Sequence, residues 1–303
     1  MSKSTYPYFG LVTWLLLCVW QWPPSPLHLD YVRLILSAAP LVIVPLCHAM
    51  DGRSFWLTFA LGAAFSLGML LPVGGVGFGL VLPWWMFSAY LTVHYGARWV
   101  SGQLAKRSEG KESKLRLQSS HGTQRSSHLF FSSACSVSLL VAASWAIADR
   151  LELSPMGFDT TIVLLTAVHF HYAGFTLIWL LGRLRGPAWM EWAIVLGVAL
   201  VAVGITTSQY GLPAWIEVVS VTILATAALR FARLLWQQKQ LLFRLGSLAL
   251  AGGMVLALAY GWRYYFPVRG LEIPVMYALH GSLNSLGFAL PVVWAFHWRH
   301  RYE

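Results

Sequence analysis

The sequence predicts an all-α membrane protein, a polytopic bundle of about ten transmembrane helices with both termini in the cytoplasm. Hydrophobic residues make up 57% of the 303 residues and charged residues only 11%, whereas about 25% of an ordinary globular chain is charged. Several apolar runs approach the roughly 20 residues that a helix needs to cross the hydrocarbon core of a bilayer. The basic residues, in addition, gather in alternate loops. This composition excludes a soluble enzyme, a coiled coil and a disordered tail.

The predicted spans are apolar runs delimited by proline, glycine and charged residues. The first run resembles a secretory signal peptide, but only Lys3 precedes it, and Trp20, Trp22 and Pro23 stand where small cleavage residues are expected. We therefore expect this helix to be retained. In chain order, the ten predicted spans are residues 9–22, 31–49, 54–71, 78–99, 129–148, 160–182, 189–207, 214–235, 241–260 and 275–297.

The distribution of lysine and arginine predicts the orientation, because cytoplasmic loops are enriched in these residues. With the N-terminus inside and ten spans, 17 of the 21 lysines and arginines fall on the cytoplasmic side. One additional or missing span would reverse the sides of all later loops, so the bias favours an even number of helices. We expect a multi-pass protein of the bacterial cytoplasmic (inner) membrane. The four basic residues on the far side are Arg33, Arg150, Arg263 and Arg269.

Residues 101–128 are rich in serine, glycine and charge, which predicts a basic cytoplasmic linker. The linker divides a front four-helix unit, residues 1–100, from a six-helix unit, residues 129–303, that carries the polar site. Its basic residues either touch anionic lipid headgroups or form a solvated connector. The net charge of +10 does not predict a nucleic-acid partner, because the basic residues are spread over loops and do not gather on one face.

Ionisable residues within or beside the spans are the candidates for function, because a charge at the bilayer centre costs about 2.5–3.5 kcal/mol. In the predicted orientation, the densest set lies toward the non-cytoplasmic half of the membrane. This set is the predicted catalytic site. Its members are Asp159, His169 and His171 of the sixth span, Glu217 of the eighth, and Glu272, His280 and Asn284 of the tenth.

The spacing of these residues constrains which of them share a face. Positions two apart on a helix point about 200° from each other, so His169 and His171 face one site only if Gly174 marks a distortion. Tyr172 follows His169 by three residues and is expected to orient its imidazole. His280 and Asn284 are four apart and stack on one face. The structural alternative is that these side chains form hydrogen bonds between packed helices.

Aromatic residues make up 15% of the chain and are expected to fill the core or to line an apolar cavity. We expect Tyr172, Trp179 and Arg263 to contact a substrate there. The three cysteines form no CxxC and no spacing typical of a metal site. Neither a metal nor a cofactor is therefore expected.

Two sequence blocks resemble those of a known family. The segments GFDTTIVLLTAVHFHYAGF (157–175) and LEIPVMYALHGSLNSLGF (271–288) are similar to signature blocks of the YndJ-like family of bacterial membrane proteins. The resemblance covers mainly residues 129–297. It implies a site at the same seven positions that the depth argument selects, Asp159, His169, His171, Glu217, Glu272, His280 and Asn284.

The predicted function is an integral membrane enzyme that performs acid–base chemistry on a lipophilic, isoprenoid- or polyketide-like substrate. Carboxylates and imidazoles in an apolar pocket suit isomerisation, cyclisation or protonation of an epoxide or olefin, and aromatic faces stabilise developing positive charge. The alternative is a transporter or permease that binds a proton or small solute with the same residues. A metal or haem site formed by His169 or His171 with His280 and Glu217, and a scaffold role, are further alternatives.

Overall fold

The computed structural model describes residues 5–108 and 120–302. Every regular element in this part of the chain is helical. Seven of the described helical segments are long and apolar enough to cross a membrane, and two shorter apolar helices, Tyr6–Trp20 and Phe55–Leu70, accompany them. The all-helical class is therefore confirmed, and the crossing of the membrane by all ten spans stays a prediction.

The described residues fold into α-helices along most of their length. In chain order they are α1 (Tyr6–Trp20), α2 (Leu29–Ala38), α3 (Val44–Met50), α4 (Phe55–Leu70), α5 (Gly75–Ser108), α6 (Ser120–Arg150), α7 (Thr160–His169), α8 (Ile178–Leu184), α9 (Ala188–Gln209), α10 (Trp215–Trp236), α11 (Leu241–Gly261), α12 (Ile273–Met276) and α13 (Leu290–Tyr302).

Four π-helical segments join some of these helices into longer ones. They are η2 (Ala39–Ile43), which links α2 to α3, η5 (Phe170–Leu177), which links α7 to α8, and η6 (Tyr277–Gly281) and η7 (Leu283–Ala289), which lie between α12 and α13. Wide π-helical turns are frequent at functional sites. Two of the three joined segments carry predicted site residues, which makes these turns relevant to the site.

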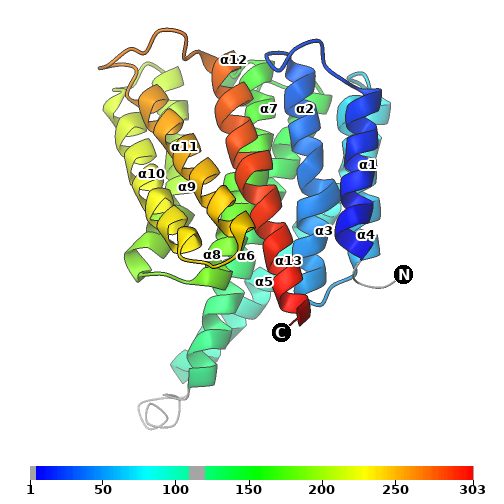
Figure 1. The fold of residues 1–303 in the computed structure, drawn as a ribbon, viewed down its shortest axis with the longest axis vertical. Coiled ribbons are helices and arrows are strands. Elements are labelled where there is room, and N and C mark those ends of the chain that lie inside the picture. Colours follow the sequence, from blue (N-terminus) through cyan, green and yellow to red (C-terminus); the bar gives the residue numbers. More distant parts are fainter. Residues whose placement is uncertain (1–4, 109–119, 303) are drawn as a thin grey trace.

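The helices form one bundle, in which α9, α10 and α11 lie on one side and α1 and α4 on the other (Figure 1). The α7–α8 and α12–α13 segments run between these two sides. Helices α10 and α9, α10 and α11, and α5 and α6 form the most extensive contacts. The start of α1 and the end of α13 lie at the same end of the bundle (Figure 1).

The predicted front and back units pack against each other. α2 contacts α7, α13 contacts α3, and one buried apolar core contains residues of both units, such as Leu41 and Phe231. Both edges of the predicted linker are helical, because α5 continues through Ser108 and α6 begins at Ser120. The Gln, Leu, Ala, Lys and Arg residues that end α5 are good helix formers. The centre of the linker, residues 109–119, lies outside the described residues.

A buried arginine at the end of α6 fastens this helix to α4. Arg150, at the end of α6, is only 1% exposed and pairs with Asp149, which is 2% exposed. Its guanidinium also donates to the carbonyl oxygens of Leu71, at 2.8 Å, and Gly68, at 3.3 Å. These carbonyls end α4 and have no partner within that helix. Arg150 therefore closes the C-terminus of α4 from inside the bundle and is not a solvated loop residue.

Candidate functional site

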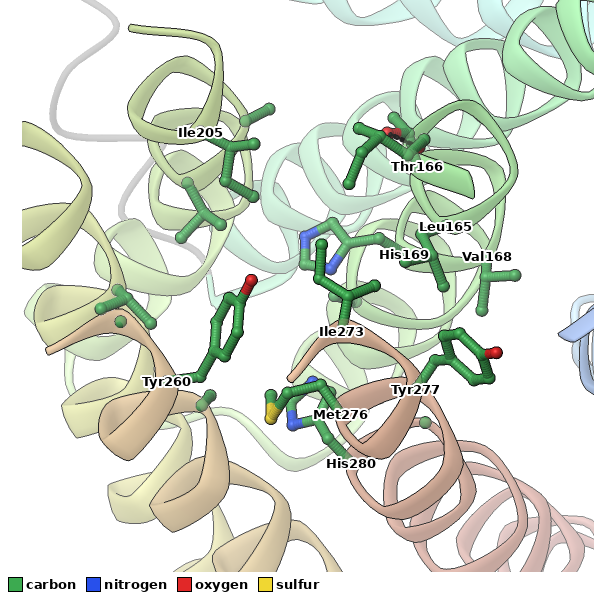
Figure 2. Close-up of a pocket in the computed structure, with 18 of the residues that line it drawn as sticks. Leu165, Thr166, Val168, His169, Ile205, Tyr260, Ile273, Met276, Tyr277 and His280 are labelled. Carbon is green, nitrogen blue, oxygen red and sulfur yellow. Dashed lines mark hydrogen bonds between the residues drawn. The ribbon is translucent and has the colours of Figure 1, made fainter. Parts of the chain in front are cut away.

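A cavity of about 660 Å³ lies between α7, α9, α10, α11 and the α12–η7 segment (Figure 2). We call it the central cavity. Most of its wall is apolar, with side chains such as Leu165, Ile205 and Met276. A cavity of this volume with few polar groups is typical of a small-molecule site.

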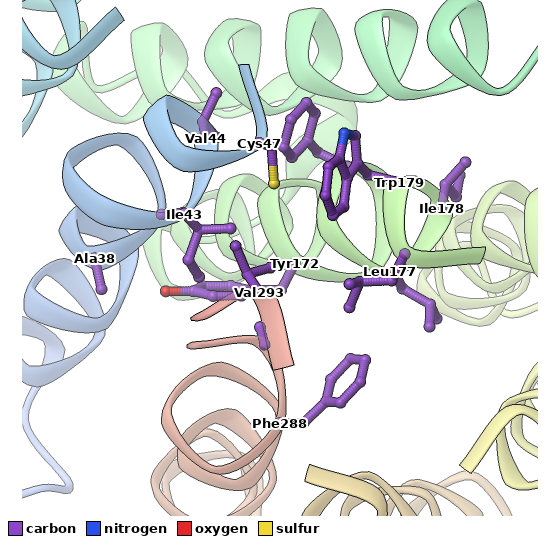
Figure 3. Packing of buried hydrophobic residues seen from close by; sticks show 14 of the residues in the cluster. Ala38, Ile43, Val44, Cys47, Tyr172, Leu177, Ile178, Trp179, Phe288 and Val293 are labelled. Carbon is purple, nitrogen blue, oxygen red and sulfur yellow. The ribbon is translucent and has the colours of Figure 1, made fainter. Parts of the chain in front are cut away.

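The central cavity is open at one end and closed at the other. Its mouth is formed by Asp159, Gln209 and Tyr264, all of which are exposed. Its floor is formed by Leu177, Ala225, Leu250 and Phe288, which are buried. Figure 3 shows Leu177 and Phe288 within the packed apolar core. A molecule can therefore enter at the mouth and meets a sealed apolar floor.

His280 of η6 lines this cavity, and one hydrogen bond fixes its tautomer. Its Nδ1 atom lies 2.8 Å from the carbonyl oxygen of Gly253 on α11. Because a carbonyl oxygen only accepts hydrogen bonds, Nδ1 carries the proton. In the neutral ring, Nε2 is then the atom with the free lone pair. Such a nitrogen is able to accept a proton from a bound molecule.

Asn284, one turn after His280, holds this arrangement in place. Its side-chain amide donates to the carbonyl oxygen of His280 at 2.8 Å and lies 3.2 Å from the Nδ1 atom of the same residue. The two residues stack on one face, as their spacing predicts, and both line the central cavity. Helix α11 approaches closely here, because a Cβ at Gly253 would lie 2.5 Å from the Asn284 amide nitrogen.

His169, the last residue of α7, faces the same cavity from the opposite wall (Figure 2). Its Nε2 atom is buried and, among the described residues, has no hydrogen-bond partner. The ring of His280 lines the same cavity. A buried polar atom without a partner is costly. A polar group of a bound molecule would satisfy it.

Glu217 lies near the mouth in the first turn of α10 and is 5% exposed. The sequence predicts that Arg263 contacts a substrate, and the structure pairs it with Glu217. The guanidinium donates to both carboxylate oxygens, at 2.6 and 3.4 Å. It also stacks over the rings of Tyr260 and Tyr264, at 4.0 and 4.3 Å. Burial lowers the pKa of Arg263, but the hydrogen bond and negative charge of Glu217 outweigh this and raise it above its usual range.

Asp159 and Tyr172 also line the central cavity, but each of them already makes a hydrogen bond within the protein. The Asp159 carboxylate accepts the backbone N–H of Ile162 at 3.0 Å and so caps α7. The Tyr172 hydroxyl donates to the carbonyl oxygen of Ile35 at 2.6 Å. The expectation that Tyr172 orients His169 is therefore corrected: this hydroxyl fastens η5 to α2.

His171 does not line the cavity. It is fully buried on the other side of the segment, with its ring 5.5 Å from that of Phe65 and 6.3 Å from that of Trp84. Its Nδ1 atom lies 2.8 Å from the carbonyl oxygen of Ala167. The distortion expected near Gly174 exists, as η5. It does not bring His171 onto the face of His169, because the π-helical turns begin between the two residues and change their angle too little.

Trp179 and Glu272 also lie away from the cavity. Trp179 is ten residues beyond His169, which places it about 15 Å further along the segment. Its indole donates to Asp51 at 3.2 Å, and the guanidinium of Arg183 lies 4.5 Å above its ring. Arg183 also pairs with Asp51.

Glu272 is exposed just before α12, where its carbonyl oxygen accepts the backbone N–H of Met276.

Sequence reasoning missed several polar groups of the cavity, among them two hydroxyl groups. Tyr260 of α11 points its hydroxyl into the cavity (Figure 2). Ser208 of α9 lines the mouth, and its Oγ atom is buried without a partner among the described residues. Both stand at the ends of predicted spans, at the same predicted depth as Glu217 and Arg263. That shared depth is the signal that would have found them.

The described part of the chain contains no group of three or more His, Cys, Asp or Glu residues that could hold a metal ion. His169, His280 and Glu217 share the cavity wall, but Glu217 is engaged by Arg263 and the Nδ1 atom of His280 by Gly253. The site is therefore best described as two imidazoles and an amide at the middle of an apolar cavity, with a paired charge near its mouth.

Comparison with known proteins gives a family match. A family model described as "YndJ-like protein" matches residues 34–288, which include the residues of the central cavity named above. A protein of Bacillus subtilis (strain 168) with the name "uncharacterized membrane protein YndJ" is 29% identical over 246 residues, covering 76% of this chain and 40% of the relative. The chain thus spans less than half the length of that relative. No solved structure matches the chain.

Proposed function

The chain belongs to the YndJ-like family, and we propose that it is an integral membrane enzyme that performs acid–base chemistry on a lipophilic substrate. One observation carries the proposal. Two imidazoles from different segments, His169 and His280, face each other across an apolar cavity, and neither of their Nε2 atoms has a hydrogen-bond partner among the described residues. Unengaged proton-transfer groups in a substrate-sized cavity are the elements of a general acid–base site.

The reaction that suits this geometry is the shift of a double bond or a proton-initiated cyclisation. In the isomerisation, the Nε2 atom of His280 takes a proton from a carbon that lies between the double bond and a carbonyl group, which makes this proton acidic, and the electron pair of the broken C–H bond shifts the double bond. Protonated His169 then delivers a proton to the far carbon, and proton exchange with water at the open mouth returns both imidazoles to their starting forms. One proton is removed and one is added, so no oxidant or reductant is needed. Positioned proton transfer of this kind is worth about 10²–10⁴-fold in rate.

The remaining polar groups position the two imidazoles and the substrate. The hydrogen bond to Gly253 leaves the His280 Nε2 lone pair free, and Asn284 holds the backbone carbonyl of His280. The Glu217–Arg263 pair forms a fixed dipole near the mouth. Tyr260 lies directly beside this pair, with its ring below the guanidinium. Its ring also provides an aromatic face for developing positive charge on a substrate.

We further propose that all ten predicted helices cross the cytoplasmic membrane of a bacterium, with both termini inside. The apolar length of seven described segments and the positive-inside distribution of lysine and arginine support this. Helix α1 starts and α13 ends at the same end of the bundle, as an even number of crossings requires. In this orientation, the mouth of the central cavity faces the outer leaflet.

A transporter is the second candidate, and one observation favours it. Polar residues also gather at the far end of the bundle, where Asp51, Arg183 and His48 line a small second cavity of about 30 Å³. The Nε2 atom of His48 is buried without a partner among the described residues. The buried floor residues Leu177 and Phe288 belong to the wall of the central cavity alone. A transporter must open this floor, whereas an enzyme keeps it closed.

The proposal is tested by comparing the lipophilic compounds of a strain that lacks the gene with those of the same strain complemented by variants. We expect the wild-type gene to remove one compound and to produce an isomer of equal mass. His280→Ala and Glu217→Gln are expected to abolish this conversion, while His94→Ala, on α5 outside the cavity, preserves it. Conversion by both site variants at the wild-type rate would reject the site.

A further inference from the structure

The central cavity has a polar end and an apolar end, and this polarity describes the molecule that fits it. Near the mouth lie Glu217, Arg263, Ser208 and the hydroxyl of Tyr260. At the floor lie only apolar side chains, among them Ala225, Leu250 and Phe288. A molecule that fills such a cavity has a polar head and an apolar chain, and its chain enters first.

The charges near the mouth indicate the kind of head. The Arg263 guanidinium is already engaged by both oxygens of Glu217, by the Tyr260 carbonyl oxygen and by the Tyr264 hydroxyl. It therefore differs from an arginine that is available for a phosphate or carboxylate. With Asp159 included, the three charged residues of the mouth carry one positive and two negative formal charges. An anionic head would be repelled.

Two hydroxyl groups near the mouth have no hydrogen-bond partner among the described residues. They are the buried Oγ atom of Ser208 and the hydroxyl of Tyr260, which points into the cavity. Hydroxyl groups both donate and accept hydrogen bonds, so they suit an alcohol, a carbonyl or an ester. Satisfying the buried Ser208 hydroxyl would also remove the cost of an unpaired polar atom.

The depth of the cavity limits the length of the chain. On α11 the wall extends from Tyr260 to Leu250, ten residues that span about 15 Å. On α10 it extends from Glu217 to Ala225, which is about 12 Å. The imidazole of His280 is level with Gly253, about one turn above Leu250. The chain of a bound molecule must therefore pass both imidazoles to reach the floor.

We infer that the central cavity binds an amphiphile with an uncharged, oxygen-containing head at the mouth, and that Ala225 and Phe288 at the floor set the longest apolar chain that it accepts. This inference deepens the proposed function. That the bound molecule is a substrate rests on the proposed function. Binding itself needs no turnover, so the two ideas are tested separately.

The experiment uses the purified full chain in detergent and photoreactive alkyl probes that carry a diazirine. Octanol and dodecanol probes test chain length, and dodecanoate tests the charge of the head. Mass spectrometry of peptides measures labelling of the cavity segments 241–261 and 273–302. We expect saturable labelling by both alcohols and labelling by dodecanoate that is weaker by about tenfold, since an unpaired charge would be left near the mouth.

Two floor variants of opposite effect test the length limit. Ala225→Phe fills the floor and is expected to weaken dodecanol labelling by about tenfold, the cost of excluding roughly two methylene groups, while octanol is unaffected. Phe288→Ala deepens the floor and is expected to allow labelling by a hexadecanol probe. Val219→Phe, on the exposed face of α10, is the matched control and changes neither. Circular dichroism and size-exclusion chromatography report whether each variant folds.

The outcomes separate this inference from the proposed enzyme. Equal labelling by dodecanoate and dodecanol, or unchanged selectivity in both floor variants, would overturn the inference even if the protein catalyses proton transfer. Length-selective labelling in a protein without turnover would support the binding mode and reject the acid–base reaction.

Discussion

The Nδ1 atom of His280 lies 2.8 Å from the carbonyl oxygen of Gly253, and this contact joins the α12–α13 segment to α11 at the level of the proposed reaction. It does two things at once. It fixes the proton on Nδ1, so that the lone pair of Nε2 is available to a bound molecule. It also requires the two helical segments to approach closely, which only a glycine at position 253 permits.

A methyl group at position 253 is therefore expected to disturb the site. In Gly253→Ala, the new Cβ would lie 2.5 Å from the Asn284 amide nitrogen and 2.9 Å from its oxygen, so Asn284 must move. We expect a loss of about 1–3 kcal/mol in stability, as for overpacked cores, together with reduced turnover. Thermal unfolding and substrate conversion measure both effects.

The neighbouring glycine provides the control. A Cβ at Gly252 would meet only Leu283, at 3.6 Å, which is an ordinary van der Waals contact. Gly252→Ala is expected to retain stability and turnover. If the two alanine variants behaved alike, the close approach at Gly253 would have no special role.

The two histidines of the sixth predicted span are expected to respond differently to substitution. His169 faces the central cavity, so His169→Gln should lower turnover by about 10²–10⁴-fold with little change in stability. His171 packs against Phe65 and Trp84, so His171→Ala should lower stability by about 2–5 kcal/mol, because it leaves a cavity in the core. Turnover of the folded fraction and thermal unfolding distinguish the two roles. A loss of turnover confined to His171→Ala would reverse the assignment.

The Glu217–Arg263 pair is expected to couple α10 to the loop after α11. A double-mutant cycle with Glu217→Gln and Arg263→Met should give a coupling energy of about 1–3 kcal/mol. The pKa of Arg263 is raised, so its contribution to stability is present below its unfolded pKa and is lost only when the pH rises through the higher folded value. The coupling should therefore persist from neutral to mildly alkaline pH. A coupling that disappears in mildly alkaline buffer would contradict this pairing.

Arg150 is expected to be a stability residue without a role in the reaction. Arg150→Met leaves buried Asp149 with only the more distant guanidinium of Arg33, at 4.0 Å, and leaves the last carbonyls of α4 without this donor. We expect a loss of about 3–5 kcal/mol in stability. Arg233→Met, on an exposed part of α10, is the control and should have no effect. Unfolding in denaturant measures the difference, and equal stability of both variants would show that the buried pair contributes nothing.

The sequence was sufficient to predict the helical class, and most of the site residues that it selected line one cavity. Charge is so rare in this chain that each ionisable residue in a span stood out, and the positive-inside distribution gave each one a depth. That depth placed His169, Glu217, His280 and Asn284 together, and the structure brings all four to one cavity.

Rotation about the helix axis and pairing between distant residues could not be predicted as well. Depth alone does not distinguish the face of His169 from that of His171 when neighbouring helices are unknown. The ion pair between Glu217 and Arg263 joins residues 46 positions apart, and the contact of Trp179 with Asp51 joins residues 128 apart. Such pairs depend on how the helices pack, and no periodicity within one helix contains that information.

The measurement that tests the acid–base proposal most directly is the transfer of solvent deuterium to carbon. Purified protein is incubated in heavy water with the lipophilic extract of a strain that lacks the gene, and high-resolution mass spectrometry detects compounds that gain non-exchangeable deuterium. We predict that one lipophilic compound gains carbon-bound deuterium with the wild type and with His94→Ala, but not with His280→Ala. Absence of deuterium in every sample, or equal incorporation by His280→Ala, would contradict the account.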